Sequence, residues 1–216
     1  MQALSVGLAQ YFAYAISTTN KGIDVVMDYD KKQGNSRYKI LFAGNLQTMH
    51  IDQINISAQL AGSAHLRNTF YSQREQSFVL AAAPPAKATL QLEYGYRKAT
   101  IGARTTYFEK QTLLGYGEDG LGIDPRVPSD ADATVYVRDE FRYKSKPVTD
   151  LYASYQLTPK ITLYAGAGNL LNVHPSLGVA RGAKSWAYNN EPAGPWDTVQ
   201  MGGNGTRLFT RLLFQF

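Results

Sequence analysis

Apolar and polar residues alternate along most of this chain with a period of two, in segments of about ten residues. Within residues 87–96 the even positions are apolar and most of the odd ones are polar, and residues 98–107 alternate in the same manner. Five further segments share the pattern: 22–30, 38–48, 149–157, 161–171 and 207–216. Each predicts a strand with one apolar and one polar face, and residues Val6 to Ile16 predict an eighth strand. Since no segment is convincingly helical, we expect an all-β chain.

The connections between these segments alternate in length. Three are short, with the sequences DKKQGNSR, YRKA and TPK. The other three, 51–85, 109–147 and 172–205, are longer than compact soluble domains ordinarily tolerate. Short turns at one end and long loops at the other are typical of an outer-membrane β-barrel, whose turns face the periplasm and whose loops face outward.

A water-soluble β-sandwich also has alternating strands, with its apolar positions in a core. Two further features favour the membrane: Tyr and Phe flank the apolar faces as an interfacial girdle does, and the last strand ends on Phe216 without a polar tail. We therefore expect a segment of a transmembrane antiparallel barrel with about seven or eight up-and-down strands.

Charge determines which face of the last strand meets lipid. Arg207 or Arg211 near the bilayer midplane would cost about 2–4 kcal/mol if it faced lipid. We expect these arginines and Gln215 to face the lumen. Lipid then receives the opposite parity, with Phe216 at the periplasmic rim, and this set comprises Leu208, Leu212, Phe214 and Phe216.

The composition excludes several other classes of protein. The chain has 216 residues and no cysteine, which rules out disulfides and thiolate metal sites. Its net charge of +5 comes from scattered Lys and Arg without a basic run, so we expect no nucleic-acid partner. No apolar stretch is long enough for a transmembrane helix. The opening residues lack the basic start of a signal peptide, and Gln10 interrupts their apolar region.

Several motifs resemble those of TonB-dependent outer-membrane receptors. STTNKGIDVVMDY is similar to a family segment that leads into an alternating strand. YQLTPKITLYAGAGNLLNVHPS resembles the penultimate hairpin, with Asn169, Leu170, Leu171 and Asn172 as its Asn-Leu-hydrophobic-Asn element. MGGNGTRLFTRLLFQF resembles the closing strand. The resemblance covers nearly all of the chain, in order.

This resemblance implies active import of a scarce ligand, such as an iron-siderophore, haem, cobalamin or an oligomeric nutrient, across the bacterial outer membrane. A plug domain would fill a barrel of about 22 strands. A TonB-type coupling protein would supply energy through an N-terminal box. The alternating end of the chain resembles the signal that the barrel-assembly machinery recognises.

No segment of the sequence resembles the family's plug, coupling box or export signal, so we expect residues 1–216 to be the C-terminal part of such a barrel. Eight strands cut from a wide barrel leave two unpaired edges, which hydrocarbon does not tolerate. The missing strands come from a longer parent or another chain. The alternative is a self-contained eight-stranded outer-membrane protein with a structural, adhesive or lipid-modifying role.

Candidate binding residues fall into two groups. Lumen-facing charges are candidates for contact with a plug or ligand, although simple hydration explains them as well: Asp24, Asp28, Lys87, Glu93, Arg104, Arg207 and Arg211. Aromatic residues of the long loops are candidates for a ligand platform, with interface anchoring or loop packing as the alternative: Tyr116, Tyr136, Trp186, Tyr188 and Trp196.

Catalytic and cofactor motifs are missing. The histidines His50, His65 and His174 have no ligand spacing, and GAGNLL has Asn where a hydrolase elbow requires Ser. The acidic loop containing Glu118, Asp119, Asp124, Asp130 and Asp132 does not fit the EF-hand spacing, so a solvated loop is expected rather than a calcium site. We expect a transport component without cofactor or metal, and not an enzyme.

Overall fold

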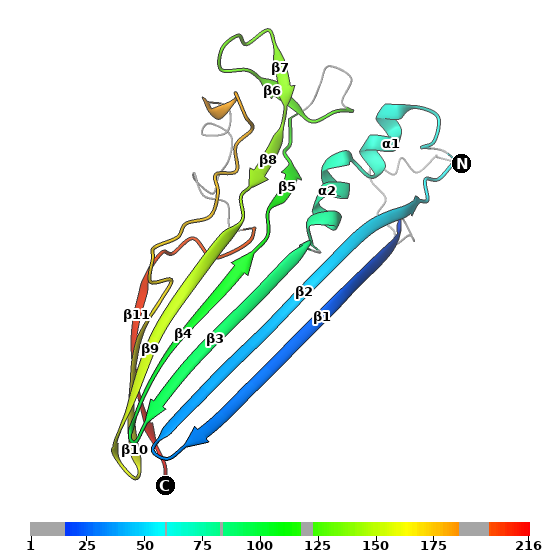
Figure 1. The fold of residues 1–216 in the computed structure, drawn as a ribbon. Coiled ribbons are helices and arrows are strands. Elements are labelled where there is room, and N and C mark those ends of the chain that lie inside the picture. The colour runs from blue at the N-terminus through cyan, green and yellow to red at the C-terminus, as the bar shows by residue number, and fades with distance from the viewer. Residues whose placement is uncertain (1–15, 59, 83, 118–122, 186–198) are drawn as a thin grey trace, which may run out of the picture.

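The fold is an open antiparallel sheet with its long loops gathered at one end (Figure 1). The computed structural model describes residues 16–58, 60–82, 84–117, 123–185 and 199–216. Seven strands form the sheet in the order β1-β2-β3-β4-β9-β10-β11. They are β1 (Ile16–Gln33), β2 (Ser36–Ile54), β3 (Ala86–Tyr96), β4 (Ala99–Phe108), β9 (Lys146–Thr158), β10 (Ile161–Gly168) and β11 (Arg207–Phe214). The seven expected strands and their up-and-down order are confirmed, whereas residues 6–15 of the expected eighth lie outside the described residues.

The connections alternate in length as expected. Gly34–Asn35, Arg97–Lys98 and Pro159–Lys160 are tight turns at one end of the sheet, which we call the turn end. Residues 55–85, 109–145 and 169–206 form the opposite loop end. The strands run further than their alternation indicated, because β1 and β2 pair from Gln33↔Ser36 up to Ile16↔Ile54.

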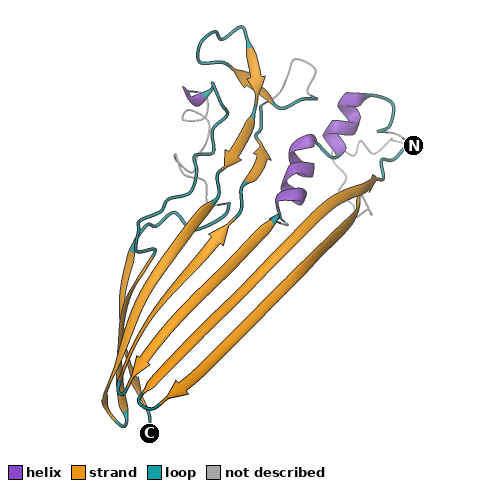
Figure 2. Ribbon diagram, in the orientation of Figure 1, coloured by secondary structure: helices purple, strands orange, loops and turns teal. Residues whose placement is uncertain are grey.

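The loops contain structure that the sequence analysis missed. Helices α1 (Ala64–Phe70) and α2 (Gln73–Ala81) lie in the first long loop (Figure 2). The expectation of no helix was therefore wrong. The Ser72 hydroxyl accepts a hydrogen bond from the Glu75 N–H (3.2 Å), and the Glu75 carboxylate accepts one from the Ser72 N–H (2.6 Å). This capping box begins α2 and compensates for its short, weakly amphipathic sequence.

Four short strands extend the loop end. β5 (Gln111–Leu114) pairs with β8 (Glu140–Tyr143), and β6 (Arg126–Pro128) pairs with β7 (Tyr136–Arg138).

Among the described residues, no helix has the length and apolar character needed to cross a bilayer.

Both buried apolar clusters of the described residues lie in the loops and not against the sheet. One apolar cluster joins Leu113, Phe141 and Tyr143, and a second joins Val127, Ala180 and Ala183. By contrast, the sheet strands keep large apolar side chains exposed along their length, including Ile23 (65%) and Leu92 (46%). A soluble sandwich would bury these residues, so the observed distribution favours a sheet whose apolar face meets lipid.

Candidate functional site

The strand register places side chains of opposite character on the two faces of the sheet. Because paired residues point to the same face, rows of partners can be followed from strand to strand. One such row runs through Asp28, Leu41, Gln91, Arg104 and Asp150, and the row that contains Ser154, Tyr164 and Arg211 carries the same face on to β11. All seven charges chosen from the sequence lie on this face, the polar face: Asp24, Asp28, Lys87, Glu93, Arg104, Arg207 and Arg211.

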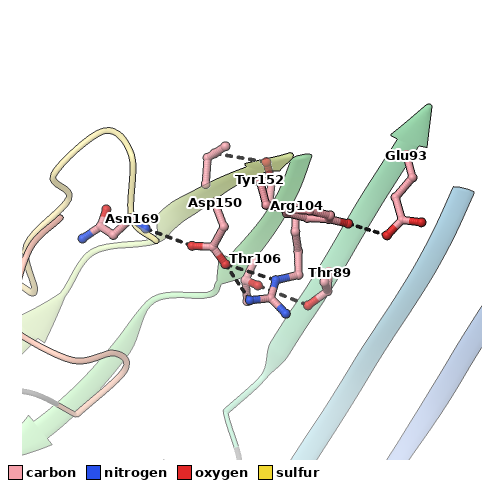
Figure 3. Close-up of polar contacts among 9 residues, drawn as sticks. Thr89, Glu93, Arg104, Thr106, Asp150, Tyr152 and Asn169 are labelled. Atoms are coloured by element: carbon pink, nitrogen blue, oxygen red, sulfur yellow. Dashed lines mark hydrogen bonds and ion pairs between the residues drawn. The ribbon is translucent and has the colours of Figure 1, made fainter. Parts of the chain in front are cut away.

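The centre of the polar face is an ion pair between β4 and β9. Arg104 Nη2 lies 2.6 Å from Asp150 Oδ2, and Arg104 Nε also donates to that oxygen over 3.1 Å (Figure 3). The second oxygen, Asp150 Oδ1, accepts the backbone N–H of Asn169 at 2.9 Å. Asp150 therefore connects the charged face of the sheet to the turn that follows β10.

A second polar contact lies one row nearer the turn end. Tyr152 donates a hydrogen bond from its hydroxyl to Glu93 Oε1 over 2.5 Å, and Gln91 Nε2 donates to the same oxygen over 2.8 Å. To reach Glu93 on β3, the Tyr152 ring crosses β4 directly above Gly102. A Cβ at Gly102 would lie 2.3 Å from Tyr152 Cζ, so only glycine leaves room for this crossing.

The Asn-Leu-Leu-Asn element forms a latch at the loop end. Asn169 and Asn172 both have left-handed backbones, with φ of 49° and 52°, which asparagine tolerates better than most residues. The Asn169 amide donates to the Val173 carbonyl (2.7 Å) and accepts the Val173 N–H (2.8 Å). Asn172 Oδ1 accepts the Thr206 N–H at 3.1 Å, so the latch joins the end of β10 to the start of β11.

The remaining charges of the polar face differ in how they are held. Asp24 accepts a hydrogen bond from Asn45 over 2.6 Å, and the Lys87 ammonium lies 5.2 Å from the Phe108 ring centroid. Arg207 and Arg211 project from β11, where neither takes part in an ion pair within the described residues. The network is thus concentrated on β3, β4 and β9 and thins towards β11.

The opposite, apolar face carries the predicted lipid-facing set. Leu208, Leu212 and Phe214 lie on it with exposed fractions of 79%, 53% and 54%. Phe216 follows β11 and is also exposed. Near the turn end this face is aromatic, and Tyr38 and Tyr94 pack as a tilted pair with centroids 5.2 Å apart.

Tyr116 and Tyr136, the two candidate loop aromatics among the described residues, lie in different segments of the 109–145 loop. Tyr116 is 72% exposed, and the guanidinium of Arg74 lies 3.4 Å from its ring centroid. Tyr136 lies on β7 in a different hairpin. Trp186, Tyr188 and Trp196 lie outside the described residues, so the platform stays a prediction.

Two of the described acidic loop residues are held by contacts within the loops, and one of them, Asp130, joins two loops. Asp130 accepts hydrogen bonds from the Ser185 hydroxyl, the Ser185 N–H and the Lys184 N–H, and these bonds hold its pKa below the usual range. Asp124 pairs with Arg126 at 2.9 Å. In the described residues no cluster of His, Asp or Glu is arranged to hold a metal, and Glu118 and Asp119 lie outside them.

Asp139 is a buried acid that the sequence analysis did not select. Its side chain accepts the Gly117 N–H at 2.8 Å, and burial raises its pKa while that bond and nearby Arg74 oppose the rise. Asp150 and Tyr152 were also missed. Both occupy polar-face positions of an alternating strand, and that parity was the available signal.

Two solved structures resemble the fold. The ferripyoverdine receptor of the outer membrane of Pseudomonas aeruginosa, bound to ferripyoverdine, matches 92% of this chain with a TM-score of 0.50 and 12% identity. The pyoverdine outer membrane receptor FpvA from Pseudomonas aeruginosa PAO1, bound to pyoverdine, matches 93% with a TM-score of 0.51 and 12% identity. The fold is that of part of an outer-membrane receptor barrel. No protein-family model and no curated protein matches the sequence.

The likeness confirms the barrel fold expected from the resemblance to TonB-dependent receptors. Both matched proteins are outer-membrane receptors by their descriptions. The chain spans only about a fifth of the length of these receptors, 20% and 22%.

Proposed function

We propose that this chain forms part of the barrel wall of a TonB-dependent receptor that imports a scarce ligand across the outer membrane. One observation carries the proposal: a seven-stranded sheet with an exposed apolar face and a charged face overlies outer-membrane receptors along 92% of the chain. The two matched proteins bind a siderophore complex or siderophore by their descriptions. An iron-siderophore is therefore the first ligand class to test, ahead of haem, cobalamin and oligomeric nutrients.

Each surface has a role in this proposal. The apolar face contacts lipid, and the polar face lines the lumen against a plug domain. Further strands pair with the free edges of β1 and β11, which do not pair with each other in the described residues. The helices and hairpins of the loop end face the outside of the cell, and a TonB-type protein delivers energy through a region that precedes these strands.

The open sheet bears on the alternative of a self-contained small barrel. Seven described strands pair only with their sequence-order neighbours in the sheet, and both outer strands keep a free edge. Hydrocarbon does not tolerate such edges, which supports the proposal that further strands pair with them. A barrel closed by this chain alone would instead resist SDS at room temperature and shift in mobility on heating.

Energised uptake tests the proposal. Cells with the intact gene and cells lacking it would be supplied separately with radiolabelled ferric siderophores, haem and cobalamin, with and without an uncoupler. We expect the deletion and the uncoupler each to abolish uptake of one ligand. The proposed function would be contradicted if the deletion changed the uptake of none of these ligands. It would also be contradicted if the uptake of one ligand depended on the gene but was unaffected by the uncoupler.

A further inference from the structure

The turn end of the sheet carries a strong excess of positive charge. Its three hairpin turns and their flanks contain one acid, Asp30, and six basic residues: Lys31, Lys32, Arg37, Arg97, Lys98 and Lys160. The acid is already engaged, because Asp30 forms an ion pair with Arg37. The loop at 109–145 shows the opposite balance, with eight acids and five basic residues. The positive charge is therefore a local property of the turn end.

A hollow of about 450 Å³ lies on the apolar face beside these turns. Its floor is made of small side chains and its sides of aromatic ones, as two adjacent rows of the register show. One row contains Tyr94, Ile101, Ala153 and Ala165, and the next contains Tyr96, Ala99, Tyr155 and Leu163. Ala99 thus separates two tyrosines that stand on either side of it.

Three of the basic residues lie in the two hairpin turns that adjoin the strands of this hollow. The Arg97 guanidinium lies 5.3 Å from the centroid of the Tyr96 ring, which lines the hollow. Lys98 directly precedes Ala99 in the floor, and Lys160 lies in the turn directly before β10, the strand that supplies Leu163. The ion pairs of the described residues involve none of these three cations. Their charge is available to an external anion.

We propose that this hollow is a binding site for an anionic glycerophospholipid of the membrane leaflet at the turn end. An acyl chain lies over Ala99 and Ala153 between the tyrosines, and the headgroup phosphate is bound by Arg97, Lys98 and Lys160. The inference rests on the proposed function in one respect, because it requires the apolar face to meet lipid.

Charge complementarity and position argue for this occupant. Tyrosine is enriched at the membrane interface, where an aromatic ring meets both acyl chains and headgroups. Basic residues next to a bilayer surface attract anionic lipid, and basic pockets on membrane proteins bind phosphorylated headgroups. A soluble apolar ligand would not require three cations at the mouth, and a free phosphate would not require the apolar floor.

Lipid retention during native mass spectrometry tests the inference. The protein is purified from outer membranes, in whatever assembly it forms there, and mixed with micelles containing phosphatidylglycerol or phosphatidylcholine with identical acyl chains. We expect phosphatidylglycerol to be retained at least about tenfold better. Replacing Arg97, Lys98 and Lys160 with Gln should weaken its retention about fivefold for each cation removed. Glycerol phosphate, which has the headgroup without the chains, should compete poorly.

Matched variants separate the hollow from general effects. Ala99→Leu fills the hollow and should lower retention of both lipids, and the milder Ala153→Val should do the same to a smaller extent. Ala103→Leu adds the same bulk on the same face of β4 but outside the hollow, so retention should not change. Lys31→Gln with Lys32→Gln removes positive charge from another hairpin and should have little effect.

Several results would overturn the inference. They are equal retention of the two lipids, equal effects of Ala99→Leu and Ala103→Leu, or competition by glycerol phosphate as strong as by the lipid. If the protein is recovered in the outer membrane and one of these results is obtained, the lipid site fails while the membrane assignment stands. A protein absent from the outer-membrane fraction would defeat both.

Discussion

The contact between Tyr152 and Glu93 predicts that a single methyl group on the neighbouring strand disrupts the polar face. In Gly102→Ala the new Cβ would lie 2.3 Å from Tyr152 Cζ and 2.5 Å from its hydroxyl oxygen, which is far inside van der Waals contact. The end of the ring is the part able to move, so it should swing away from β4. That movement breaks the 2.5 Å hydrogen bond to Glu93.

The cost follows from the bond that is lost. A hydrogen bond to a charged group contributes about 1.5–3 kcal/mol, and the half-buried position of both residues favours the lower end. Tyr152→Phe removes the same bond without moving the ring and should cost about 1.5 kcal/mol. Because Gly102→Ala has already broken it, adding Tyr152→Phe should cost almost nothing more. The double-mutant cycle therefore predicts a coupling of about 1.5 kcal/mol.

The assay is urea unfolding of the protein in its outer-membrane assembly, followed by loss of trypsin resistance. Gly95→Ala is the control. Gly95 lies on the same face of the adjacent strand β3, and a Cβ there would have its nearest contact at 3.4 Å, which is ordinary van der Waals distance. Two results would show that the Tyr152 ring does not cross β4. One is a loss of stability in Gly102→Ala no greater than in Gly95→Ala, and the other is a double variant whose loss equals the sum of those of Tyr152→Phe and Gly102→Ala.

Three further predictions concern the latch, the loops and the lumen. Asn169→Ala loses two hydrogen bonds at a left-handed residue and should lower the free energy of unfolding by about 1–3 kcal/mol, with faster proteolysis within 173–206. The control Asn45→Ala loses one exposed hydrogen bond and should cost less. Equal costs would contradict the latch. The raised pKa of Asp139 means that its ionised form opposes folding, so hydrogen-exchange protection of β5 and β8 should increase as pH falls from neutral through that pKa. The lowered pKa of Asp130 has the opposite consequence. Its hydrogen bonds to Lys184 and Ser185 should be lost only at lower pH, where Asp130 protonates below its ordinary range. Asp139→Asn should remove the first change, and a persistent change would refute the assignment. Arg211→Leu should leave membrane insertion intact but expose a plug domain to added protease, and unchanged uptake with unchanged protease resistance would exclude a role in seating the plug.

Local pattern was sufficient for the strands and their faces. Parity alone placed Glu93 and Arg104 on the same face, because side chains alternate strictly along a strand. The short α2 helix was missed although Ser72 and Glu75 have the spacing of a capping box. In a loop flanked by long strands, a helix of this length has too few turns to show a clear period.

The side-chain contacts between strands could not be predicted from the sequence. Arg104 and Asp150 are 46 residues apart, and they meet only because β9 returns to β4 after the long 109–145 loop. The side chains of Tyr152 and Glu93 likewise meet across an intervening strand. No local pattern encodes such contacts, since they depend on strand order and register. The Asn-Leu-Leu-Asn element of the latch is recognisable in the sequence, but its hydrogen bonds depend on how the chain folds around it.

Site-directed spin labelling of β3 tests the central claim most directly. The chain has no cysteine, so single cysteines at Thr89, Leu90, Gln91 and Leu92 can be labelled in the outer-membrane assembly without background from this protein. Collision with oxygen, which concentrates in hydrocarbon, should be frequent at Leu90 and Leu92 and rare at Thr89 and Gln91. A uniform profile, or the opposite alternation, would contradict a barrel wall with its apolar face in lipid.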